Sequence, residues 1–340
     1  MTDFLSSLAA APRLLARANL RPVQSDRFQP TGFPDLGPAN YTLPDGTEMI
    51  LVESAQSMAN RAETVCWDDA AGKLVADLDG LPYVHVQIMD GNDEVATTSS
   101  VLEAHRLNSP YVLQGAVGGR TFEEAFLERA AFKKGCPVDR GRFLAAVFHY
   151  DPASLLHGLF MSNVEDGRMR LPRVMSSFIE ARNVRPAHSG GVKNDRVNAS
   201  GDTEAGFGNV PFARTEFTAE SITCFLNVDL RQLRSFGLPA ECTRLLQVLA
   251  LYKFRRMLRD GLRLRTACDL EVKDVLVEAP AGFETPDLPT LEREVAIAIG
   301  ACPKHFADPA VTKVAFQTTT ESSKASRKAA KEKKEKEKKS

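Results

Sequence analysis

Apolar positions along this chain recur with two spacings, and each spacing predicts a set of elements. Short runs rich in Val, Ile, Leu and Phe, bounded by Gly, Pro or polar residues, are typical of strands. Such runs cover residues 47–54, 81–89, 141–150, 173–184, 216–230 and 262–277. Segments in which apolar residues recur every three or four positions are typical of amphipathic helices. These cover residues 1–20, 55–67, 99–107, 121–134, 152–162 and 240–261.

Two of the predicted helices have informative N-terminal residues. In the helix over 121–134, Thr121 is followed three positions later by Glu124, the spacing of a capping box. At the start of the chain Asp3 precedes the arginines, which is the reverse of a secretory signal peptide. We interpret residues 1–20 as an amphipathic helix, with an organellar transit peptide as the alternative.

The order of the predicted elements indicates the fold class. Strands and helices are mixed without strict alternation, which favours an α+β fold over a doubly wound parallel sheet. A β-α-β-β-α-β core enlarged by insertions fits this order. We expect a single domain over residues 1–317. Residues 318–340 are rich in lysine and glutamate, so we expect a disordered tail there.

Charge is distributed unevenly between the body and this tail. Nine of the 43 Lys and Arg residues, but only four of the 44 Asp and Glu residues, lie in the last twenty positions. The remaining 34 basic and 40 acidic groups give residues 1–320 a net charge near −6. A polyanionic partner would therefore have to bind a local basic surface, because the body as a whole repels it weakly.

Cysteine spacing and apolar run length exclude several classes of protein. The six cysteines lie far apart without a C-x-x-C pair, which indicates neither a zinc site nor a compact disulfide framework. The longest apolar runs, such as residues 143–148, are far shorter than the roughly 18 residues of a membrane span. We expect a cytoplasmic protein with reduced thiols, no membrane contact, no metal and no cofactor.

The segment SGGVKNDRVNASGDTEAGFGNVPFAR, residues 189–214, is the strongest functional candidate. It has the composition of a flexible Gly-rich basic loop, which we place at about residues 187–214. It lacks the P-loop pattern, does not open a helix as a dinucleotide fingerprint must, and lacks the ligand alternation of a calcium loop at Asp195, Asn198 and Asp202.

Phosphate binding remains as a chemical role for this loop. Glycine lets backbone N–H groups approach a phosphate closely, and lysine and arginine neutralise it. The residues concerned are Gly190, Gly191, Gly201, Gly206, Gly208, Lys193, Arg196 and Arg214. Phe207 and Phe212 have aromatic rings that can stack on bases or wedge between them. An ordinary solvated surface loop is the alternative interpretation.

Three further segments carry side chains that suit nucleic acid. The cations of residues 252–265 are interpreted first as the solvated face of a core helix, with subunit contact or RNA as the alternative. Gln56, Asn60 and Arg61 follow a predicted strand, and His105 and Arg106 lie near a predicted helix end. Both sets can donate to a phosphodiester backbone. The six histidines form no recognised catalytic motif.

Five stretches of the sequence together resemble one known family. They are FPDLGPANYTLPDGTEMILVESAQSMANRAE, EAHRLNSPYVL, SGGVKNDRVNASGDTEAGFGNVPFARTEFTA, FLNVDLRQL and DGLRLRTACDL. In this order they resemble the backbone subunit of the type I-G (formerly I-U) CRISPR Cascade effector complex, a member of the RAMP (repeat-associated mysterious protein) superfamily. The resemblance spans about residues 20–300, and segments 151–162 and 227–233 are similar, more distantly, to backbone subunits of other type I complexes.

The resemblance implies a fold, a set of partners and an assembly. It implies an RRM-like core with insertions that form a palm and a protruding thumb, although the usual RRM aromatic motif does not occur here. Several copies would assemble head to tail into a helical filament along the spacer of a CRISPR RNA. The guide would pair with target DNA in antiviral defence. Other implied partners are a large subunit and a subunit that processes the guide and caps the complex.

The resemblance also implies residue roles. Guide contact is carried over to Lys193, Asn194, Arg196, Asn209, Arg214, His105, Arg106, Gln56, Asn60 and Arg61, and Phe207 is our candidate for the thumb residue that wedges between bases. No catalytic residue is implied. One rival is an endoribonuclease of the same superfamily that uses a loop aspartate, here Asp195 or Asp202. The other is a protein scaffold or metabolic enzyme whose loop is basic by accident.

Overall fold

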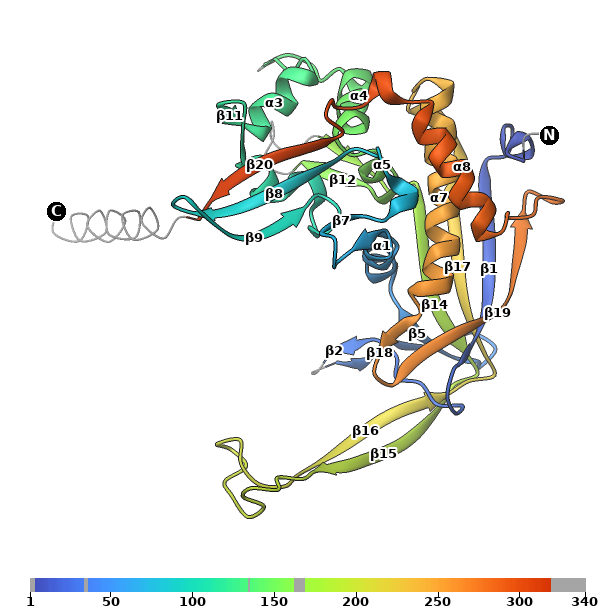
Figure 1. Ribbon diagram of the computed structural model, residues 1–340. Coiled ribbons are helices and arrows are strands. Elements are labelled where there is room, and N and C mark those ends of the chain that lie inside the picture. Colours follow the sequence, from blue (N-terminus) through green and yellow to red (C-terminus); the bar gives the residue numbers. More distant parts are fainter. Residues whose placement is uncertain (1–3, 34–35, 134, 162–168, 319–340) are drawn as a thin grey trace, which may run out of the picture. The chain divides into compact units, whose positions relative to one another are not determined.

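The computed structural model describes residues 4–33, 36–133, 135–161 and 169–318 (Figure 1). The chain divides into two compact units, which we describe separately. Unit 1 comprises Met1–Cys66, Met175–Arg231 and Ala250–Leu291, and unit 2 comprises Trp67–Val174, Gln232–Leu249 and Glu292–Ser340. The long helix α7 (Ala240–Asp260) gives its first half to unit 2 and its second half to unit 1.

The described part of unit 1 is built on a seven-stranded antiparallel sheet, in the order β18-β19-β1-β17-β14-β5-β4. Its strands in chain order are β1 (Arg13–Pro22), β4 (Asn40–Thr42), β5 (Glu48–Glu53), β14 (Met175–Arg182), β17 (Ser221–Asp229), β18 (Arg263–Arg265) and β19 (Cys268–Ala279). The four central strands, β19-β1-β17-β14, give the order 4-1-3-2 when numbered along the chain. This order, with all neighbours antiparallel, confirms the β-α-β-β-α-β core and the α+β class.

Helices fill the two crossovers of this core. Helix α1 (Ala55–Thr64) lies between β1 and β14 in the chain and packs on β14, and α7 lies between β17 and β19. The second half of α7 contributes the buried side chains of Tyr252, Phe254 and Met257. A short helix, α6 (Leu230–Ser235), directly follows β17.

The prediction of an N-terminal helix over residues 1–20 is wrong for its second half, which is strand β1. Leu14, Ala16, Ala18 and Leu20 are buried in strict alternation, and they lie directly opposite the buried residues of β17. Ala, Leu and Arg favour helix locally, but this propensity is weak, and pairing with two neighbouring strands outweighs it. A single 3₁₀ turn, η1 (Ser6–Leu8), precedes the strand.

Within its described residues unit 2 contains a five-stranded sheet in the order β11-β10-β20-β8-β9. The strands are β8 (Tyr83–Asp90), β9 (Asp93–Ser99), β10 (Ala116–Val117), β11 (Arg120–Thr121) and β20 (Val311–Gln317), and only β8 and β20 are parallel in this described sheet. The helices are α2 (Pro110–Leu113), α3 (Phe122–Arg129), α4 (Arg140–Tyr150) and α5 (Ala153–His157), with α8 (Leu288–Gly300) shared between the units. Edge-to-face contacts of Phe122 with Tyr150 and of Phe126 with Phe143 form part of the core.

Apart from one long hairpin described below, the remaining elements are short. They are the ribbons β2 (Gly32–Phe33) with β3 (Gly37–Pro38), β6 (Trp67–Asp68) with β7 (Lys73–Leu74) and β12 (Leu159–Met161) with β13 (Met169–Leu171), and the 3₁₀ turns η2 (Ala76–Leu78), η3 (Arg106–Asn108) and η5 (Pro303–His305).

No helix of the described residues is long and apolar enough to cross a membrane. The predicted disordered tail lies, from residue 319 onward, outside the described residues.

Several local predictions are confirmed and others are wrong. Helices α1, α3 and α7 and strands β5, β8 and β14 lie where the sequence predicts them, and Thr121 and Glu124 form the capping box at 3.2 and 2.9 Å. Residues 141–150, predicted as strand, form α4, because their apolar run buries neighbours one turn apart. The predicted helix over 99–107 is a set of turns that ends in η3.

Two other predicted elements are each divided in the structure. Helix α5 ends at Gly158, whose φ of +84° belongs to the left-handed region, and β12 then begins. The strand predicted over 262–277 is a hairpin of β18 and β19. In both cases a turn divides what the sequence suggested was one continuous element.

Candidate nucleic-acid interface

The segment predicted as a flexible loop belongs to a β-hairpin of unit 1, in which its two ends are strands and residues 194–209 between them are turns and irregular backbone. Strands β15 (Arg185–Lys193) and β16 (Val210–Thr218) pair from Arg185 with Thr218 to Lys193 with Val210. The loop prediction is therefore wrong for these residues. Cross-strand pairing satisfies the backbone of a glycine-rich segment whose composition alone suggested a loop.

The hairpin is an insertion between β14 and β17, which are neighbouring strands of the β-α-β-β-α-β core. It extends outward from the sheet (Figure 1). Its base is fixed by a β-bridge in which Phe28 and Phe217 exchange backbone hydrogen bonds of 2.9 and 2.8 Å. Both phenylalanine side chains are buried. The base is thus part of the core, whereas the outer residues are largely exposed.

The pairing register divides the hairpin into two faces. Lys193, Arg214 and Phe212 share one face, because side chains two apart along a strand, and side chains directly opposite, point the same way. The Arg214 guanidinium carbon lies 5.7 Å from the centre of the Phe212 ring. A Cβ atom on Gly191 would lie 3.2 Å from that ring, so the glycine leaves room for it. We call this side the cationic face.

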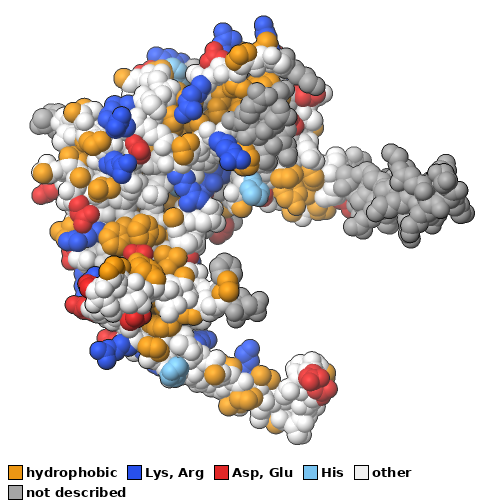
Figure 2. All heavy atoms as spheres, turned by 180° about the vertical axis from the view of Figure 1, so that it is seen from behind, with side chains coloured by type: hydrophobic (Ala, Val, Ile, Leu, Met, Phe, Trp, Pro, Cys, Tyr) orange, Lys and Arg blue, Asp and Glu red, His pale blue; other side chains and the backbone are white. Residues whose placement is uncertain are grey.

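On the opposite face the side chains nearest the tip are small or apolar, and the next pair toward the base is polar. This face carries Gly190 opposite Ala213, Val192 opposite Pro211, and His188 opposite Thr215. A Cβ atom on Gly190 would meet the carbonyl oxygen of Phe212 at 2.6 Å, so this glycine is required by close approach of the two backbones. Seen from behind, the hairpin carries hydrophobic side chains along its length, with basic side chains and a histidine among them and acidic side chains at its tip (Figure 2).

The tip between the two strands is a folded turn organised by Asp195. One carboxylate oxygen accepts the backbone N–H groups of Val197 and Asn198 at 2.8 and 2.9 Å, and the other accepts that of Gly208 at 3.0 Å. The backbone N–H of Asp195 donates to the side chain of Asn209 at 2.8 Å. These bonds hold the pKa of Asp195 below its ordinary value. The tip therefore has a defined conformation, which we did not predict from the sequence.

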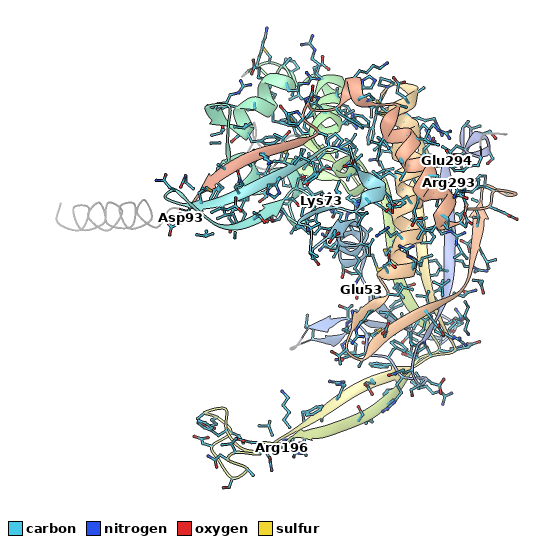
Figure 3. All side chains as sticks on the ribbon, in the orientation of Figure 1. Glu53, Lys73, Asp93, Arg196, Arg293 and Glu294 are labelled. Carbon is cyan, nitrogen blue, oxygen red and sulfur yellow. The ribbon has the colours of Figure 1, made fainter. Side chains whose placement is uncertain are left out.

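The predicted guide-contact residues of the hairpin lie at or near this tip. Lys193, Asn194 and Arg196 are exposed, and Figure 3 places Arg196 at the far end of the hairpin. Among the described residues no ion pair involves Lys193 or Arg196. Phe207, the candidate wedge, has 53% of its surface exposed. Arg214 is half-buried and lies 3.7 Å from the Glu216 carboxylate.

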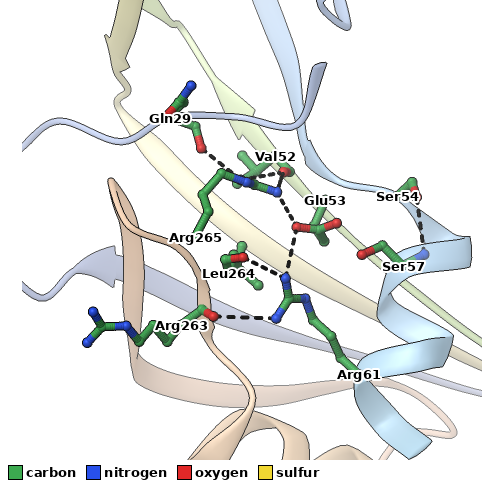
Figure 4. A network of polar contacts seen from close by, with 9 residues as sticks. All are labelled: Gln29, Val52, Glu53, Ser54, Ser57, Arg61, Arg263, Leu264 and Arg265. Carbon is green, nitrogen blue, oxygen red and sulfur yellow. Dashed lines mark hydrogen bonds and ion pairs between the residues drawn. The ribbon is translucent and has the colours of Figure 1, made fainter. Parts of the chain in front are cut away.

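Of the three predicted guide-contact residues on helix α1, two lie at the surface and one points into the interior. Gln56 and Asn60 are exposed, and their side-chain amides lie 3.4 Å apart. Arg61 points inward and donates to the carbonyls of Leu264 at 2.7 Å and Arg263 at 3.4 Å (Figure 4). Burial lowers its pKa. In this structure Arg61 holds α1 to β18.

A buried carboxylate completes the network that surrounds Arg61. Glu53 is only 3% exposed, lies 3.7 Å from Arg61 and also pairs with Arg265 (Figure 4). Arg265 donates further to the carbonyls of Gln29 at 2.7 Å and Val52 at 3.3 Å. Two guanidinium groups thus share one buried carboxylate, which ties β5, α1 and β18 together.

The arginines of the long helix are also used internally. Arg255 donates to the carbonyls of Thr285 at 2.7 Å and Pro286 at 3.0 Å, and Arg256 donates to that of Val65 at 2.6 Å. The prediction of a solvated helix face is wrong for these two residues. Hydrogen bonds to backbone acceptors of neighbouring segments explain their positions.

The remaining predicted pair lies in unit 2. His105 is exposed, directly before η3. Arg106 is 6% exposed and has a φ of +52°, an uncommon backbone conformation for a residue with a side chain. Only His105 of this pair therefore presents its side chain to the surface. No local signal in the sequence indicated that Arg106 would turn inward.

Neither metal nor thiol chemistry is evident in the part of the chain that the structure describes. No group of three or more His, Cys, Asp or Glu side chains there is placed to hold a metal ion. All six cysteines lie in described segments, none forms a disulfide, and five of them are buried. Burial raises the pKa of Cys224 to about 12, which leaves its thiol protonated.

Comparisons with solved structures find only loose likenesses. A chain described as "CRISPR RNA-guided surveillance complex, pre-nicking" is 14% identical with a TM-score of 0.42, and the match covers 82% of this chain and 82% of that one. A chain described as "CRISPR RNA-guided surveillance complex" is 13% identical with a TM-score of 0.37, covering 82% of this chain and 74% of that one. At these scores positions cannot be equated, and the fold assignment depends on the strand order described above.

Sequence comparison is more specific. No curated protein sequence matches this chain. The family model described as "CRISPR-associated protein GSU0053 (Cas_GSU0053)" matches residues 14–186. That range begins at β1, includes all of β14 and amounts to just over half of the chain. The chain belongs to the CRISPR-associated protein GSU0053 family.

Proposed function

We propose that this protein is a non-catalytic backbone subunit of a type I-G CRISPR Cascade complex. Copies assemble head to tail along the spacer of the CRISPR RNA, grip its phosphate backbone and expose its bases for pairing with target DNA in antiviral defence. The observation that carries this proposal is the two-faced hairpin β15–β16, which extends from the core strands and presents, at its folded tip, Lys193 and Arg196 without an ion pair among the described residues. Family membership supports the CRISPR context.

A subunit that must hold any guide sequence can contact phosphates and 2′-hydroxyls but must leave the base edges free. Lys193, Asn194 and Arg196 supply donors of this kind at the tip, and Arg214 supplies another on the cationic face. Phe207 is the proposed wedge between bases, because it lies in the tip segment and its ring is exposed. His105, Gln56 and Asn60 are proposed as further contacts.

Arg61 and Arg106 remain predicted guide contacts, although both serve the fold in this structure. Arg61 donates to backbone carbonyls of β18, and Arg106 is buried. The other proposed partners are further copies of the chain, a large subunit and a guide-processing, end-capping subunit, all in the cytoplasm. The proposed role requires neither a cofactor nor a metal.

The hydrogen bonds of Asp195 support the non-catalytic proposal over the ribonuclease alternative. Both of its carboxylate oxygens accept backbone N–H groups and so build the tip. Asp202, the other candidate, accepts the backbone N–H of Glu204 at 2.9 Å. A catalytic carboxylate must present an oxygen to its substrate or to a metal, whereas both oxygens of Asp195 already accept the backbone N–H groups that shape the tip.

The test is binding of labelled guide RNA to the full chain over a series of salt concentrations. Lys193→Ala combined with Arg196→Ala should weaken binding at low salt and reduce the slope of log K against log salt by about 1.4, or about 0.7 for each lost phosphate contact. Lys73→Ala combined with Lys273→Ala is the matched control, because both lysines are exposed and neither lies on the hairpin. Equal slopes for the two double variants would refute the proposal. Metal-dependent RNA cleavage that Asp195→Ala or Asp202→Ala abolishes would favour the ribonuclease.

A further inference from the structure

The short ribbon β12–β13 of unit 2 has an unusual outer face. Leu159 pairs with Leu171 and Met161 with Met169, and all four side chains are buried. Phe160 pairs with Arg170 between them, so alternation turns this pair outward. The outer face of the ribbon thus consists of an exposed phenylalanine and an exposed arginine.

The two outward side chains stack on each other. The guanidinium carbon of Arg170 lies 4.1 Å above the centre of the Phe160 ring, although 42% of the phenylalanine remains exposed. No carboxylate among the described residues pairs with Arg170. The planar guanidinium therefore contacts the ring, and no acid among the described residues uses its N–H donors. Such a plane can stack on an unpaired base and donate to the adjoining phosphate.

The surroundings of the ribbon fit the same ligand. Strand β12 packs beside η3, the turn that His105 directly precedes. His105 is exposed and adds a polar ring with hydrogen-bonding nitrogens to this part of unit 2. An aromatic ring, a stacked guanidinium and an imidazole form the usual set for sequence-tolerant binding of single strands.

We propose that Phe160, Arg170 and His105 form a second contact for single-stranded nucleic acid, separate from the hairpin β15–β16. An unpaired base stacks on the guanidinium plane of Arg170, whose N–H groups also bind the adjoining phosphate, and Phe160 is the positioning residue that holds this plane. His105 binds the strand beside them. The inference builds on the proposed function and adds a site within it, for which the ligand is a strand of guide RNA or of target DNA.

The test uses the full chain with single-stranded oligonucleotides of equal length that contain one 2-aminopurine, one series of RNA and one of DNA. Quenching of this fluorescent base reports stacking, which a purely structural role of the pair would not change. Arg170→Lys keeps the charge but loses the plane, so we expect quenching to be lost and affinity to fall about tenfold. Phe160→Leu keeps the apolar volume and should weaken binding about threefold through loss of the stacked cation.

Arg142→Lys is the matched control, because Arg142 is also an exposed arginine of unit 2. Loss of quenching only with RNA identifies the guide as the ligand, and loss only with DNA identifies the target strand. If Arg170→Lys and Phe160→Leu bind and quench both series like the original chain, the proposal is overturned. It is equally overturned if the two variants lower only the unfolding temperature, since the pair is then a brace for the ribbon.

The outcomes for the two sites are distinguishable. If the hairpin variants lose guide binding while Arg170→Lys does not, the proposed function stands and the second contact fails. If Arg170→Lys loses quenching while the hairpin variants bind guide normally, the second contact stands and the hairpin proposal fails. Losses in both sets that combine multiplicatively indicate two independent contacts.

Discussion

The cations of the hairpin tip and the arginines around Glu53 look alike in the sequence but differ completely in the structure. Lys193 and Arg196 are exposed and have no ion pair among the described residues. Arg61 and Arg265 share the buried Glu53 carboxylate and donate to backbone carbonyls. Figure 3 places Arg196 at the far end of the hairpin and Glu53 near the sheet.

The difference lies in what each cation can reach. An arginine that points toward the core binds buried carbonyls or a carboxylate. Breaking these bonds costs more free energy than a contact with a phosphate at the surface would supply. A cation on a two-stranded ribbon has few such acceptors, so its donors stay available to a polyanion. In unit 1, therefore, a cation is a candidate for binding when its N–H donors have no acceptor within the fold, whether it is a lysine or an arginine. Four predictions test the buried network, the tip and the cationic face in turn.

The largest expected effect concerns the buried network around Glu53. Glu53→Gln removes the shared negative charge and leaves two partly buried guanidinium groups without a counter-ion, which should lower the free energy of unfolding by roughly 3–5 kcal/mol. Urea unfolding followed by circular dichroism measures this change. Glu271→Gln is the matched control, because its partner Arg21 is exposed, and it should cost less than about 1 kcal/mol. Equal losses would show that the buried network is no more important than a surface pair.

Short-range patterns predicted much of the fold. Helices α1, α3 and α7 were predicted because apolar spacing, and for α3 also the capping box, is a property of neighbouring residues. The β-α-β-β-α-β core was predicted from the mixture of element types, but its first strand, β1, was taken for a helix, so the strand order is known only from the structure. The run FLAAVF in α4 was taken for a strand because a short apolar run does not distinguish a buried strand from a buried helix.

The candidate site was less predictable, because its details depend on distant partners. Glu53 and Arg265 are 212 positions apart, so no local pattern connects them. Arg106 turns inward at a left-handed backbone position that the sequence does not mark. The tip bonds of Asp195 had a local signal, since aspartate commonly accepts N–H groups two and three residues ahead, as it does here. The pairing register that creates the two hairpin faces had no local sequence signal, because glycine and small residues interrupt the alternation of polar and apolar side chains.

A second, smaller effect tests whether the tip is ordered rather than flexible. Asp195→Ala removes the acceptor of three backbone N–H groups, so the amides of Val197, Asn198 and Gly208 should exchange with solvent about tenfold faster or more. The unfolding temperature should not change, because the tip is exposed. Hydrogen exchange measured by NMR gives both results. Asp202→Ala, which removes a single such bond, should change exchange less.

The pH dependence of the same amides gives an independent check. The hydrogen bonds lower the pKa of Asp195 in the folded state, so their contribution is complete above the ordinary carboxyl value of about 3.9 and is lost only as pH falls through the lowered value. Protection of the tip should therefore be constant between about pH 5 and pH 7 once intrinsic exchange is subtracted. Loss of protection in that range would contradict the role assigned to Asp195.

The smallest expected effect concerns Arg214, which lies between the two classes of cation. It is half-buried, 3.7 Å from Glu216, and its guanidinium lies over Phe212 on the cationic face. Phe212→Leu should leave the charge in place but release the guanidinium, which we expect to weaken guide binding about twofold to threefold. Val192→Ala, on the opposite face, should leave binding unchanged. If the two variants bind guide equally well, the faces do not differ in function, and only the cations of the tip separate the hairpin from the buried network.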